Sequence, residues 1–275
     1  MNLLIESGAT KSTCIGYNDT CTFFTYKTAG INATYASKDA IHDIFCDIIV
    51  KNNIDVSLIQ NIRYYGAGCF NSNQAEKVKD VLSNLFPNTN ISVLSDLYAA
   101  CHALCCHKPG FVAILGTGAA SCFYDGEQIV KKAPSLGWLL GDEGSGVHLG
   151  KLFVNEYLKD NLATEMSHDF EKQFAVSKPI VFEKVYRTPN PQTFLASLPI
   201  FLHKHLENKQ IRTIVENAFQ EFFNQQISYY TTFPQPWYFC GSIAYYFQHI
   251  LREVAQKNKL TVENIIPECA EKLLL

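Results

Sequence analysis

The chain has 275 residues, of which 47% are hydrophobic and 18% charged, and its formal net charge is -3. These values are typical of a globular protein long enough for one large domain or two smaller ones. There is no excess of positive charge that would favour nucleic acid or an anionic membrane as a partner. No apolar run approaches the roughly 18 residues that a membrane-spanning helix requires.

The start of the chain and its ten cysteines indicate a reducing compartment. Residues 1–6 turn acidic at Glu6 and lack the basic start of a signal peptide, so we expect a cytoplasmic protein with reduced thiols. Zinc binding is one interpretation of the densest cysteine group, which contains Cys101, His102, Cys105, Cys106 and His107. The alanines and leucines within that group favour a buried helix, where cysteine behaves as a small hydrophobic residue.

The first hundred residues alternate short apolar strands with helices. Strands are predicted at residues 3–5, 13–17, 21–26, 61–65 and 91–94. Helices are predicted at residues 37–52, 73–85 and 96–107, where apolar residues recur at helical spacing. A tight turn at Glu6–Ser12 joins the first two strands, and Asn18-Asp19 provides a hairpin turn to the third.

The same succession of strands and turns recurs in the second part of the chain. Strands are predicted at 111–115, 119–124 and 128–132, with turns at 116–118 and 125–126. Thr117 follows Thr10, Asp125 follows Asn18, and Gly137 follows Gly30, each by 107 positions. A fixed offset across three turn signals predicts an internal duplication. We therefore expect a first domain at 1–108 and a second at 109–275, with a last helix that returns to the first domain as an open option.

The remaining residues are predicted to be mainly helical. A helix is expected from Gly146 to about residue 161, and residues 170–230 form further helices broken at 188–191 and Pro199. An aromatic strand at 237–240 is followed by Gly241 and a helix to about residue 258. The whole pattern predicts an α/β protein with two similar lobes, each a mixed sheet flanked by helices, and a cleft between them.

The stretch from Ser135 to Lys151 is the most informative part of the sequence. It contains five glycines around the pair Asp142-Glu143 and continues directly into a predicted helix. Glycine lets backbone amides approach a ligand closely, and a helix N-terminus attracts anions. Two carboxylates at the same point suit sugar hydroxyls or a hydrated cation. A tight turn followed by an acidic helix cap is the alternative.

Two turns, one in each half of the chain, suit phosphate. The first is Gly8-Ala9-Thr10-Lys11 and the second is Gly116-Thr117-Gly118. A strand followed by such a turn directs backbone amides at one point, which is the geometry that binds phosphate. Neither turn has the G-x-x-x-x-G-K-[ST] spacing of a P-loop. Singly each could be an ordinary hairpin, but as a pair they favour two contacts with one polyphosphate.

Several segments of the chain together resemble a known family. The segments E-S-G-A-T-K, S-D after a strand, I-L-G-T-G, G-W-L-L-G-D-E-G-S-G and C-G-S-I-A occur in the order found in BadF/BadG/BcrA/BcrD-type ATPases. Within that family the sequence is similar to the branch containing N-acetylglucosamine kinase, in the sugar kinase, actin and chaperone ATPase superfamily. The resemblance extends from Leu3 to about Glu253. It implies two ribonuclease-H-like lobes and the cofactors ATP and Mg²⁺.

The resemblance also implies roles for individual residues. Asp96 corresponds to the carboxylate that takes the proton from the sugar hydroxyl, and Glu6 to the residue that holds magnesium. The phosphates and adenosine of ATP would be bound by Gly8, Thr10, Lys11, Gly116, Thr117, Gly118, Gly241 and Ser242. The amino sugar would be bound by Asn32, Gly137, Trp138 and Asp142. Judged by position alone, Asp96 could instead be the N-cap of the following helix, and Trp138 a core residue.

One position departs from the family pattern. The family usually has aspartate where this chain has Glu6. The added methylene can move a bound ion by about 1 Å, and a displacement of that size is costly for catalysis. Activity could therefore be weakened. The closing segment from Ile265 to Leu275 also differs from the family pattern.

The resemblance implies an ATP-dependent kinase for an N-acetylated amino sugar such as N-acetylglucosamine. One alternative is the ATPase activator of a 2-hydroxyacyl-CoA dehydratase, which has the same fold and carries an iron–sulfur cluster. Its cysteine-rich motif has no match in this sequence. A second alternative is a non-catalytic sensor of nucleotide or sugar, suggested by Glu6. The expected partners are small molecules, with neither nucleic acid nor membrane, and the sequence leaves a homodimer open.

Overall fold

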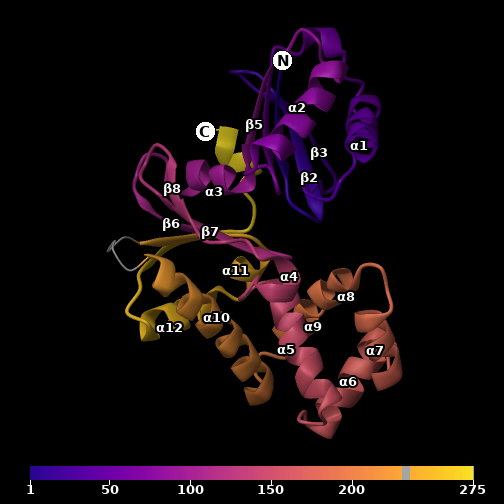
Figure 1. Cartoon of the computed structure of the whole chain (residues 1–275), viewed down its shortest axis with the longest axis vertical. Coiled ribbons are helices and arrows are strands. Elements are labelled where there is room, and N and C mark those ends of the chain that lie inside the picture. The colour runs from indigo at the N-terminus through magenta and orange to yellow at the C-terminus, as the bar shows by residue number, and fades with distance from the viewer. Residues whose placement is uncertain (231–235, 275) are drawn as a thin grey trace. The chain divides into compact units, whose positions relative to one another are not determined.

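The computed structural model describes residues 1–230 and 236–274 (Figure 1). It divides into two compact units. The first unit contains residues 1–107 together with the C-terminal residues from Glu268 onward, and the second contains Lys108–Pro267. The chain passes from the first unit to the second at Lys108, and its C-terminal residues belong to the first unit.

The first unit is built on a five-stranded mixed sheet with strand order β3-β2-β1-β4-β5. The strands are β1 (Asn2–Ser7), β2 (Lys11–Tyr17), β3 (Thr22–Ala29), β4 (Asn61–Gly66) and β5 (Asn90–Ser95). The first three strands are antiparallel neighbours, whereas β4 and β5 run parallel to β1. This arrangement brings the ends of β1, β4 and β5 to the same edge of the sheet, where Glu6 and Asp96 lie.

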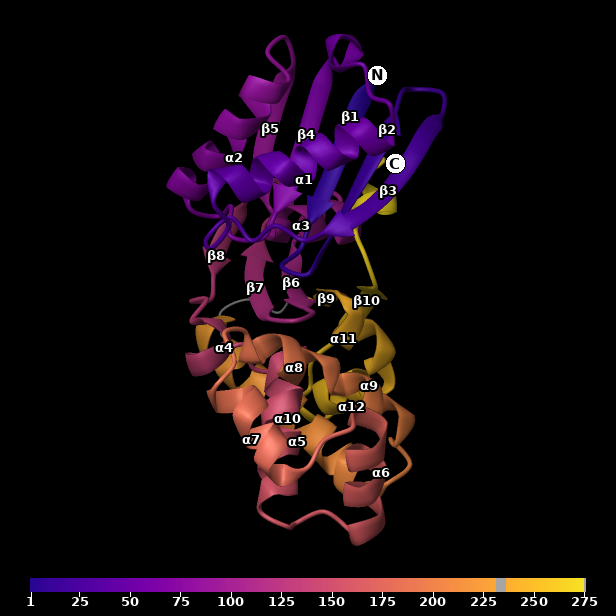
Figure 2. The ribbon, with the colours of Figure 1, turned by 90° about the vertical axis from the view of Figure 1, so that its right-hand side faces the viewer.

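Helices α1 (Lys38–Lys51) and α2 (Ser72–Leu85) lie side by side across one face of this sheet (Figure 2). Ser37 begins α1 by accepting the N–H of Ala40, and Asn71 begins α2 by accepting the N–H of Asn73. Their apolar faces pack on Leu3 and Ile5 of β1, in one core cluster. A short helix η1 (Val56–Leu58) precedes β4, α3 (Asp96–Leu104) follows β5, and the 3₁₀ helix η2 (Ala270–Leu274) comes from the C-terminus.

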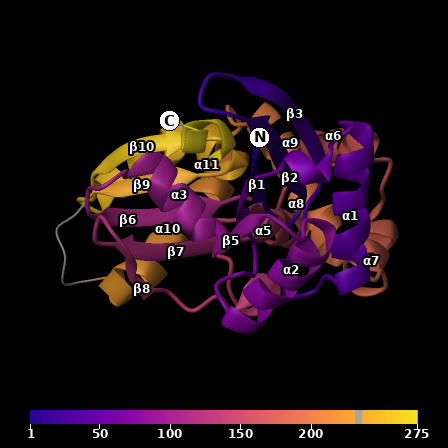
Figure 3. The same ribbon diagram turned by 90° about the horizontal axis from the view of Figure 1, so that it is seen from above.

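The second unit has a sheet of the same design, with strand order β10-β9-β6-β7-β8. Figure 3 shows these strands side by side in that order. They are β6 (Gly110–Leu115), β7 (Ala119–Tyr124), β8 (Ile129–Lys132), β9 (Trp237–Cys240) and β10 (Val262–Ile266). As in the first unit, three antiparallel strands are followed by two that run parallel to the first of them.

Helices form the rest of the second unit. They are α4 (Gly137–Leu140), α5 (Gly146–Leu158), α6 (Thr164–Phe174), α7 (Lys178–Tyr186), α8 (Pro191–Ser197), α9 (Pro199–Lys204), α10 (Lys209–Tyr230), α11 (Ser242–Tyr246) and α12 (Gln248–Lys257). Their core is strongly aromatic. Trp237 stacks on Phe239 with ring centroids 5.8 Å apart, and Phe222 of α10 meets both rings edge-on or tilted.

The duplication inferred from the sequence is visible in the hydrogen bonds of the hairpin turns. Asn18 Oδ1 accepts the N–H groups two and three residues ahead, and Asp125 Oδ1 does the same at 2.8 Å for both. The turn that joins the first two strands of each sheet is one residue longer in the first unit than in the second. Four residues separate the paired Ser7 and Ser12, but three separate Leu115 and Ala119. The offset of 107 therefore holds from Thr10 onward. These matching sheets confirm the predicted α/β fold.

Some elements were not predicted. Strand β10 was missed because Thr261–Ile266 mixes polar and apolar residues without strict alternation, and it pairs with β9 through a register shift. Helix α4 was missed because it starts at Gly137, whose φ is +74°. The helix predicted to follow Gly241 is divided in two at Phe247. Within the described residues, no helix is both long and apolar enough to cross a membrane.

Candidate functional site

The first expected phosphate turn is closed by its own backbone and by Gly30. The N–H of Gly8 donates to the carbonyl of Lys11 at 2.9 Å, and the N–H of Gly30 donates to the carbonyl of Thr10 at 3.0 Å. A Cβ on Gly30 would lie 2.4 Å from the Gly8 oxygen and 2.5 Å from the Lys11 nitrogen. Only glycine fits there, so residues 8–11 and 30 form one packed structure.

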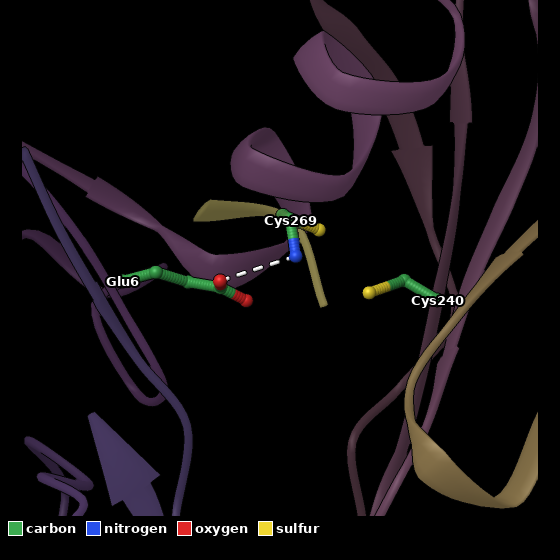
Figure 4. Close-up of side chains that lie close together, drawn as sticks. All are labelled: Glu6, Cys240 and Cys269. Atoms are coloured by element: carbon green, nitrogen blue, oxygen red, sulfur yellow. Dashed lines mark hydrogen bonds between the residues drawn. The ribbon is translucent and has the colours of Figure 1, made fainter. Parts of the chain in front are cut away.

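The Glu6 carboxylate has backbone partners at the C-terminus of the chain. Its Oε2 accepts the N–H of Cys269 at 3.1 Å (Figure 4). The same oxygen accepts the N–H of Ala270 at 2.7 Å, at the start of η2. Burial raises the pKa of Glu6, while these two hydrogen bonds lower it. Glu6 therefore caps η2 through one oxygen and leaves Oε1 for another ligand.

Lys11 and Lys27 both pair with Glu268, at the start of the C-terminal segment. The Lys27 Nζ lies 3.0 Å from Glu268 Oε2, and Lys11 pairs with Oε1. Burial raises the pKa of Glu268, but the two lysines hold it below its ordinary value. More than half of the Lys11 side chain remains exposed, at 56%. The ion pair is therefore weak enough to exchange for a ligand phosphate.

Asn32 is engaged in a local turn. Its Oδ1 accepts the N–H of Thr34 at 3.0 Å, and its backbone forms a bridge with Ala67. A Cβ on Gly68 would lie 2.7 Å from that same Oδ1. The carbonyl end of the amide is thus fixed by the fold, and the amino end is the part with capacity to meet a sugar.

Asp96 is the first residue of α3 and follows β5 directly. The N-cap position belongs to Ser95, whose side chain makes no capping hydrogen bond. Asp96 Oδ1 instead accepts the N–H of Leu97 at 3.0 Å. The Ser95 hydroxyl is buried and, among the described residues, has no hydrogen-bond partner. A buried polar atom of this kind often marks the place of a ligand or a water molecule.

The second expected phosphate turn lies against the N-terminus of α5. The N–H of Gly146 donates to the carbonyl of Gly116 at 2.8 Å, and the N–H of Val147 donates to that of Thr117 at 3.2 Å. The turn is also closed by a bond from the Gly116 N–H to the Gly118 carbonyl at 3.0 Å. Two N–H groups that the helix would otherwise leave unpaired thereby fix the turn.

Asp142 contacts this second turn directly. Its carboxylate accepts the N–H of Ala119, and a Cβ on Gly118 would lie 2.9 Å from its Oδ2. Burial raises the pKa of Asp142, and Lys151 lowers it. The residue expected to bind the sugar therefore also supports the phosphate turn.

Gly241 and Ser242 approach the same turn from the end of β9. Gly241 has a φ of +114°, and a Cβ there would lie 2.4 Å from the carbonyl oxygen of Leu115. Its N–H donates to Ile266 at 3.0 Å. Ser242 begins α11. Three separate segments of the second unit, at 115–119, 142–147 and 241–242, thus meet at one place.

Gly137 and Trp138 lie in the short helix α4. Trp138 is partly buried against the core of the second unit, and its carbonyl accepts a hydrogen bond from Lys151 Nζ at 2.7 Å. Leu139 and Leu140 beside it are 68% and 73% exposed. Part of the indole is therefore core, and α4 presents an apolar surface to solvent.

His148 supports the glycine-rich loop and was not identified from the sequence. Its Nδ1 accepts the N–H of Gly144 at 3.1 Å, and its Nε2 lies 3.1 Å from Glu221 of α10. Burial lowers the pKa of His148 to about 4. The sequence feature that could have identified His148 is its position three residues after Ser145. Ser145 is the N-cap of α5, and its hydroxyl accepts the His148 N–H.

The cysteine group in and after α3 contributes to packing. Cys101 and Cys105 are buried, with exposed fractions of 0% and 2%. His102 Nδ1 lies 3.1 Å from the hydroxyl of Tyr65.

The family of this chain can be inferred from its similarity to known proteins. No family model and no curated protein sequence matches the chain. Among solved structures, a "Putative N-acetylglucosamine Kinase" from Porphyromonas gingivalis is 31% identical, with a TM-score of 0.94 over 100% of this chain and 97% of the other. A second protein of that description, from Chromobacterium violaceum, is 15% identical, with a TM-score of 0.74 over 99% and 97%.

A third structure establishes the wider fold. MreB 5 of Spiroplasma citri, bound to AMPPNP, is 10% identical and has a TM-score of 0.63 over 99% of this chain and 92% of the other. At that identity the likeness concerns the actin-like ATPase fold alone. The match to the Porphyromonas gingivalis protein goes further, because it combines 31% identity with nearly complete coverage of both chains. The chain belongs to the same family as that protein, within the sugar kinase and actin-like ATPase superfamily.

Proposed function

We propose that this protein is an ATP-dependent kinase that phosphorylates a hydroxyl group of an N-acetylated amino sugar, such as N-acetylglucosamine. The observation that carries the proposal is the packing of the second turn, Gly116–Gly118, on Asp142, Gly241 and the N-terminus of α5. A glycine turn held rigid in this way can present its remaining backbone amides to a phosphate. An acidic residue from the glycine-rich loop at the same place suits a sugar hydroxyl.

We assign two turns to the phosphates of ATP. Gly8, Thr10 and Lys11 belong to the first unit, and Gly116, Thr117 and Gly118 to the second. Gly241 and Ser242 are assigned to the adenosine. In phosphoryl transfer the protein mainly positions the reactants and stabilises charge. We assign Lys11 to charge stabilisation, which requires it to exchange Glu268 for a phosphate oxygen.

Asp96 is assigned as the general base. As the sugar hydroxyl attacks the γ-phosphorus, the Asp96 carboxylate accepts the hydroxyl proton and ADP leaves. Asp96 is the first residue of α3, and the N-cap is Ser95. This position is consistent with the role of a base. The unpartnered hydroxyl of Ser95 beside it supports a polar ligand at this place.

The residues present also fit a magnesium ion. Mg²⁺ in kinases retains several waters and needs few protein ligands in addition to phosphate oxygens. Glu6 has one carboxylate oxygen that is not used by Cys269 or Ala270 and could hold the ion through water. When bound, the ion would neutralise charge on the phosphates. Asn32, Gly137, Trp138 and Asp142 remain assigned to the sugar.

An ATP-consumption screen with ³¹P NMR of the products tests the function. The panel is N-acetylglucosamine, N-acetylmuramic acid, N-acetylmannosamine, glucosamine and glucose. We expect a phosphorylated N-acetyl sugar with the highest kcat/KM. If glucose is used as efficiently, or if no sugar is phosphorylated, the assignment is wrong. Iron in the purified protein would instead indicate a dehydratase activator.

A non-catalytic sensor is the second candidate. Glu6 and Lys11, which would serve the metal and the phosphate, are both bonded to the C-terminal segment. A protein in which these bonds persist would bind ligands without turnover. Calorimetric binding of ATP or N-acetylglucosamine, together with no ATP consumption, would select the sensor over the kinase.

A further inference from the structure

A small polar cavity lies beside Asp142 inside the second unit. Its volume is about 20 Å³, and the side chains that matter are Ala119, Ala120, Ser121, Asp142, Glu143 and Gln226. That volume accommodates about one water molecule or the end of one substituent, and not a whole sugar ring. We call it the Gln226 cavity. Its polar groups come from the end of the glycine-rich loop, from β7 and from α10.

Gln226 is an unusual residue for its place on α10. It lies on the buried face of the helix, four residues after Phe222 and four before Tyr230, and it is only 9% exposed. Burying an amide is unfavourable unless it forms hydrogen bonds. Phe222 does not call for a polar neighbour, whereas Tyr230 and the buried Ser121 belong to the same polar network as Gln226. A ligand for the amide is one reason for glutamine at this position.

A chain of hydrogen bonds fixes the orientation of the Gln226 amide. The N–H of Ala133 donates to the Tyr230 hydroxyl at 3.0 Å, and that hydroxyl lies 3.1 Å from the Ser121 hydroxyl. The Ser121 hydroxyl donates to Gln226 Oε1. Because the oxygen is the acceptor at the end of this chain, the amino group is the free end.

The cavity therefore offers one fixed donor and two kinds of acceptor. The donor is the amino group of Gln226, and the acceptors are the carboxylates of Asp142 and Glu143. Asp142 accepts the N–H of Ala119 with one part of its carboxylate and retains capacity for another donor. The methyl groups of Ala119 and Ala120 provide a small apolar wall.

We propose that Gln226 is a specificity-determining residue of the acceptor site and that its amino group donates to the carbonyl oxygen of an acetamido substituent. This inference rests on the proposed function. The acetamido N–H pairs with one of the carboxylates, and the acetyl methyl contacts the alanine wall. A hydroxyl at the same ring position lacks the carbonyl oxygen to which Gln226 would donate. Such a sugar leaves the buried amide unpaired, which is the strongest basis for rejection.

Replacing Gln226 tests this assignment in the full-length protein. Gln226→Leu keeps the size of the side chain and removes the donor, and Gln226→Glu keeps the contact with Ser121 but places an acceptor where the donor was. For both variants we expect the ratio of kcat/KM for N-acetylglucosamine to that for glucose to fall about tenfold or more. The KM for ATP should stay near that of the parent, and the efficiency with glucose should be kept or rise, because glucose no longer leaves a buried donor unpaired.

Gln225→Leu is the matched control, because Gln225 lies on the exposed face of the same helix. It should leave the sugar preference unchanged. A preference that survives in both Gln226 variants, with melting temperatures near that of the parent, overturns the assignment. If the melting temperature of Gln226→Leu falls, Gln226→Glu decides the question.

Direct binding separates this inference from the proposed function. Isothermal titration with N-acetylglucosamine and with glucose, without ATP, measures recognition of the acetamido group alone. If no sugar is phosphorylated, the kinase proposal fails. If the parent binds N-acetylglucosamine more tightly than glucose and the Gln226 variants do not, the role of Gln226 in recognising the acetamido group would still be established. Equal binding of both sugars by the parent protein overturns it.

Discussion

At the residue scale, several expected site residues already have partners supplied by the fold. Glu6 is bonded to Cys269 and Ala270, Asn32 to Thr34, and Asp142 to Ala119. A partly buried carboxylate without such bonds would be protonated or displaced toward solvent. These contacts fix each side chain in place before a ligand arrives, and preorganisation of this kind is what transfer chemistry requires.

We expect Asp96→Asn to lower kcat by about 100-fold or more while leaving the fold and sugar binding nearly intact. The substitution keeps the shape and the hydrogen bond to Leu97, and removes only the capacity to accept a proton. Steady-state kinetics together with calorimetric sugar binding measure both effects. Turnover near that of the parent would show that Asp96 has a structural role alone.

Glu6→Asp separates two roles of the same carboxylate. Aspartate is one methylene shorter, so the hydrogen bonds to Cys269 and Ala270 should lengthen or break, at a cost of about 1–3 kcal/mol in the free energy of unfolding. Activity should be kept or raised, because aspartate is the residue that the resemblance implies for magnesium.

Denaturant unfolding and a magnesium titration of the activity test these two effects of Glu6→Asp. Glu6→Ala is the control and should lose both stability and apparent magnesium affinity. If Glu6→Ala responds to magnesium as the parent does, Glu6 has no part in holding the metal.

At the element scale, the junction between the glycine-rich loop and α5 organises the second unit. Ser145 caps the helix, His148 accepts the N–H of Gly144, and the first helical N–H groups bond the turn at 116–118. Gly144 has a φ of +75°, which glycine adopts without strain. A single helix start thus holds both the acidic loop and a phosphate turn.

His148 should make stability depend on pH. The unfolded chain binds a proton near pH 6.5, whereas burial lowers the pKa of His148 in the folded state to about 4. The contribution of His148 to the free energy of unfolding is therefore complete above about pH 6.5. It falls as the pH drops toward 4, by up to about 3 kcal/mol. Lys151, Glu143 and Glu221 are the charged groups that face it.

The comparison with His148→Phe isolates this effect, because the other histidines are the same in both proteins. The variant should be less stable at pH 7, since it loses the bond to Gly144, and the difference from the parent should narrow toward pH 4.5. Denaturant unfolding across that range gives the measurement. A difference that does not change with pH would show that His148 is not kept neutral by the fold.

Gly30→Ala should disrupt the first phosphate turn. The new methyl group would lie about 2.4–2.6 Å from backbone atoms of Gly8, Thr10 and Lys11, which cannot move independently. We expect a loss of about 1–3 kcal/mol in stability, as for other overpacked sites, and weaker ATP binding. Gly116→Ala is the control for fold, because a Cβ there meets nothing within 4 Å. Similar melting temperatures for the two variants would contradict this account of Gly30.

At the scale of the whole molecule, the sequence predicts repeated local patterns well and unrepeated ones poorly. The strand and turn order of each sheet follows from apolar runs and turn residues such as Asn18 and Asp125, whose hydrogen bonds are local. Gln226 could be recognised only as a polar residue on an apolar helical face. Its bond to Ser121, 105 positions away, is tertiary. The bond from Ala270 to Glu6, 264 positions away, is equally invisible to local patterns.

The C-terminal segment is the clearest case of a contact that local pattern does not predict. The chain leaves the first unit at residue 107, forms the whole second unit, and returns at Glu268. Cys269 and Ala270 are each 1% exposed, and the carbonyl of Leu273 accepts a hydrogen bond from Arg63 at 3.2 Å. A short tail without a clear pattern thus completes the core beside β1, β2 and α3.

Truncation after Pro267 should therefore destabilise the first unit more than the second. It removes the two N–H partners of the partly buried Glu6 carboxylate. It also exposes the apolar surface that Cys269, Ala270 and Leu273 cover. We expect the free energy of unfolding to fall by several kcal/mol, about 3 or more, because the packing of Cys269, Ala270 and Leu273 is lost together with two hydrogen bonds to Glu6. Limited proteolysis with mass spectrometry should locate the earliest cleavages within residues 1–107.

Glu268→Gln in the full-length chain is the control for this truncation. It weakens only the pairs with Lys11 and Lys27, which are largely exposed and contribute about 0–1 kcal/mol. The variant should therefore resist protease as the parent does, because η2 and its bonds to Glu6 remain. If the truncated chain also keeps its first unit resistant, the C-terminal segment is not part of the core of that unit. If Glu268→Gln alone makes residues 1–107 sensitive, the ion pairs with the lysines, rather than the cap on η2, hold the segment in place.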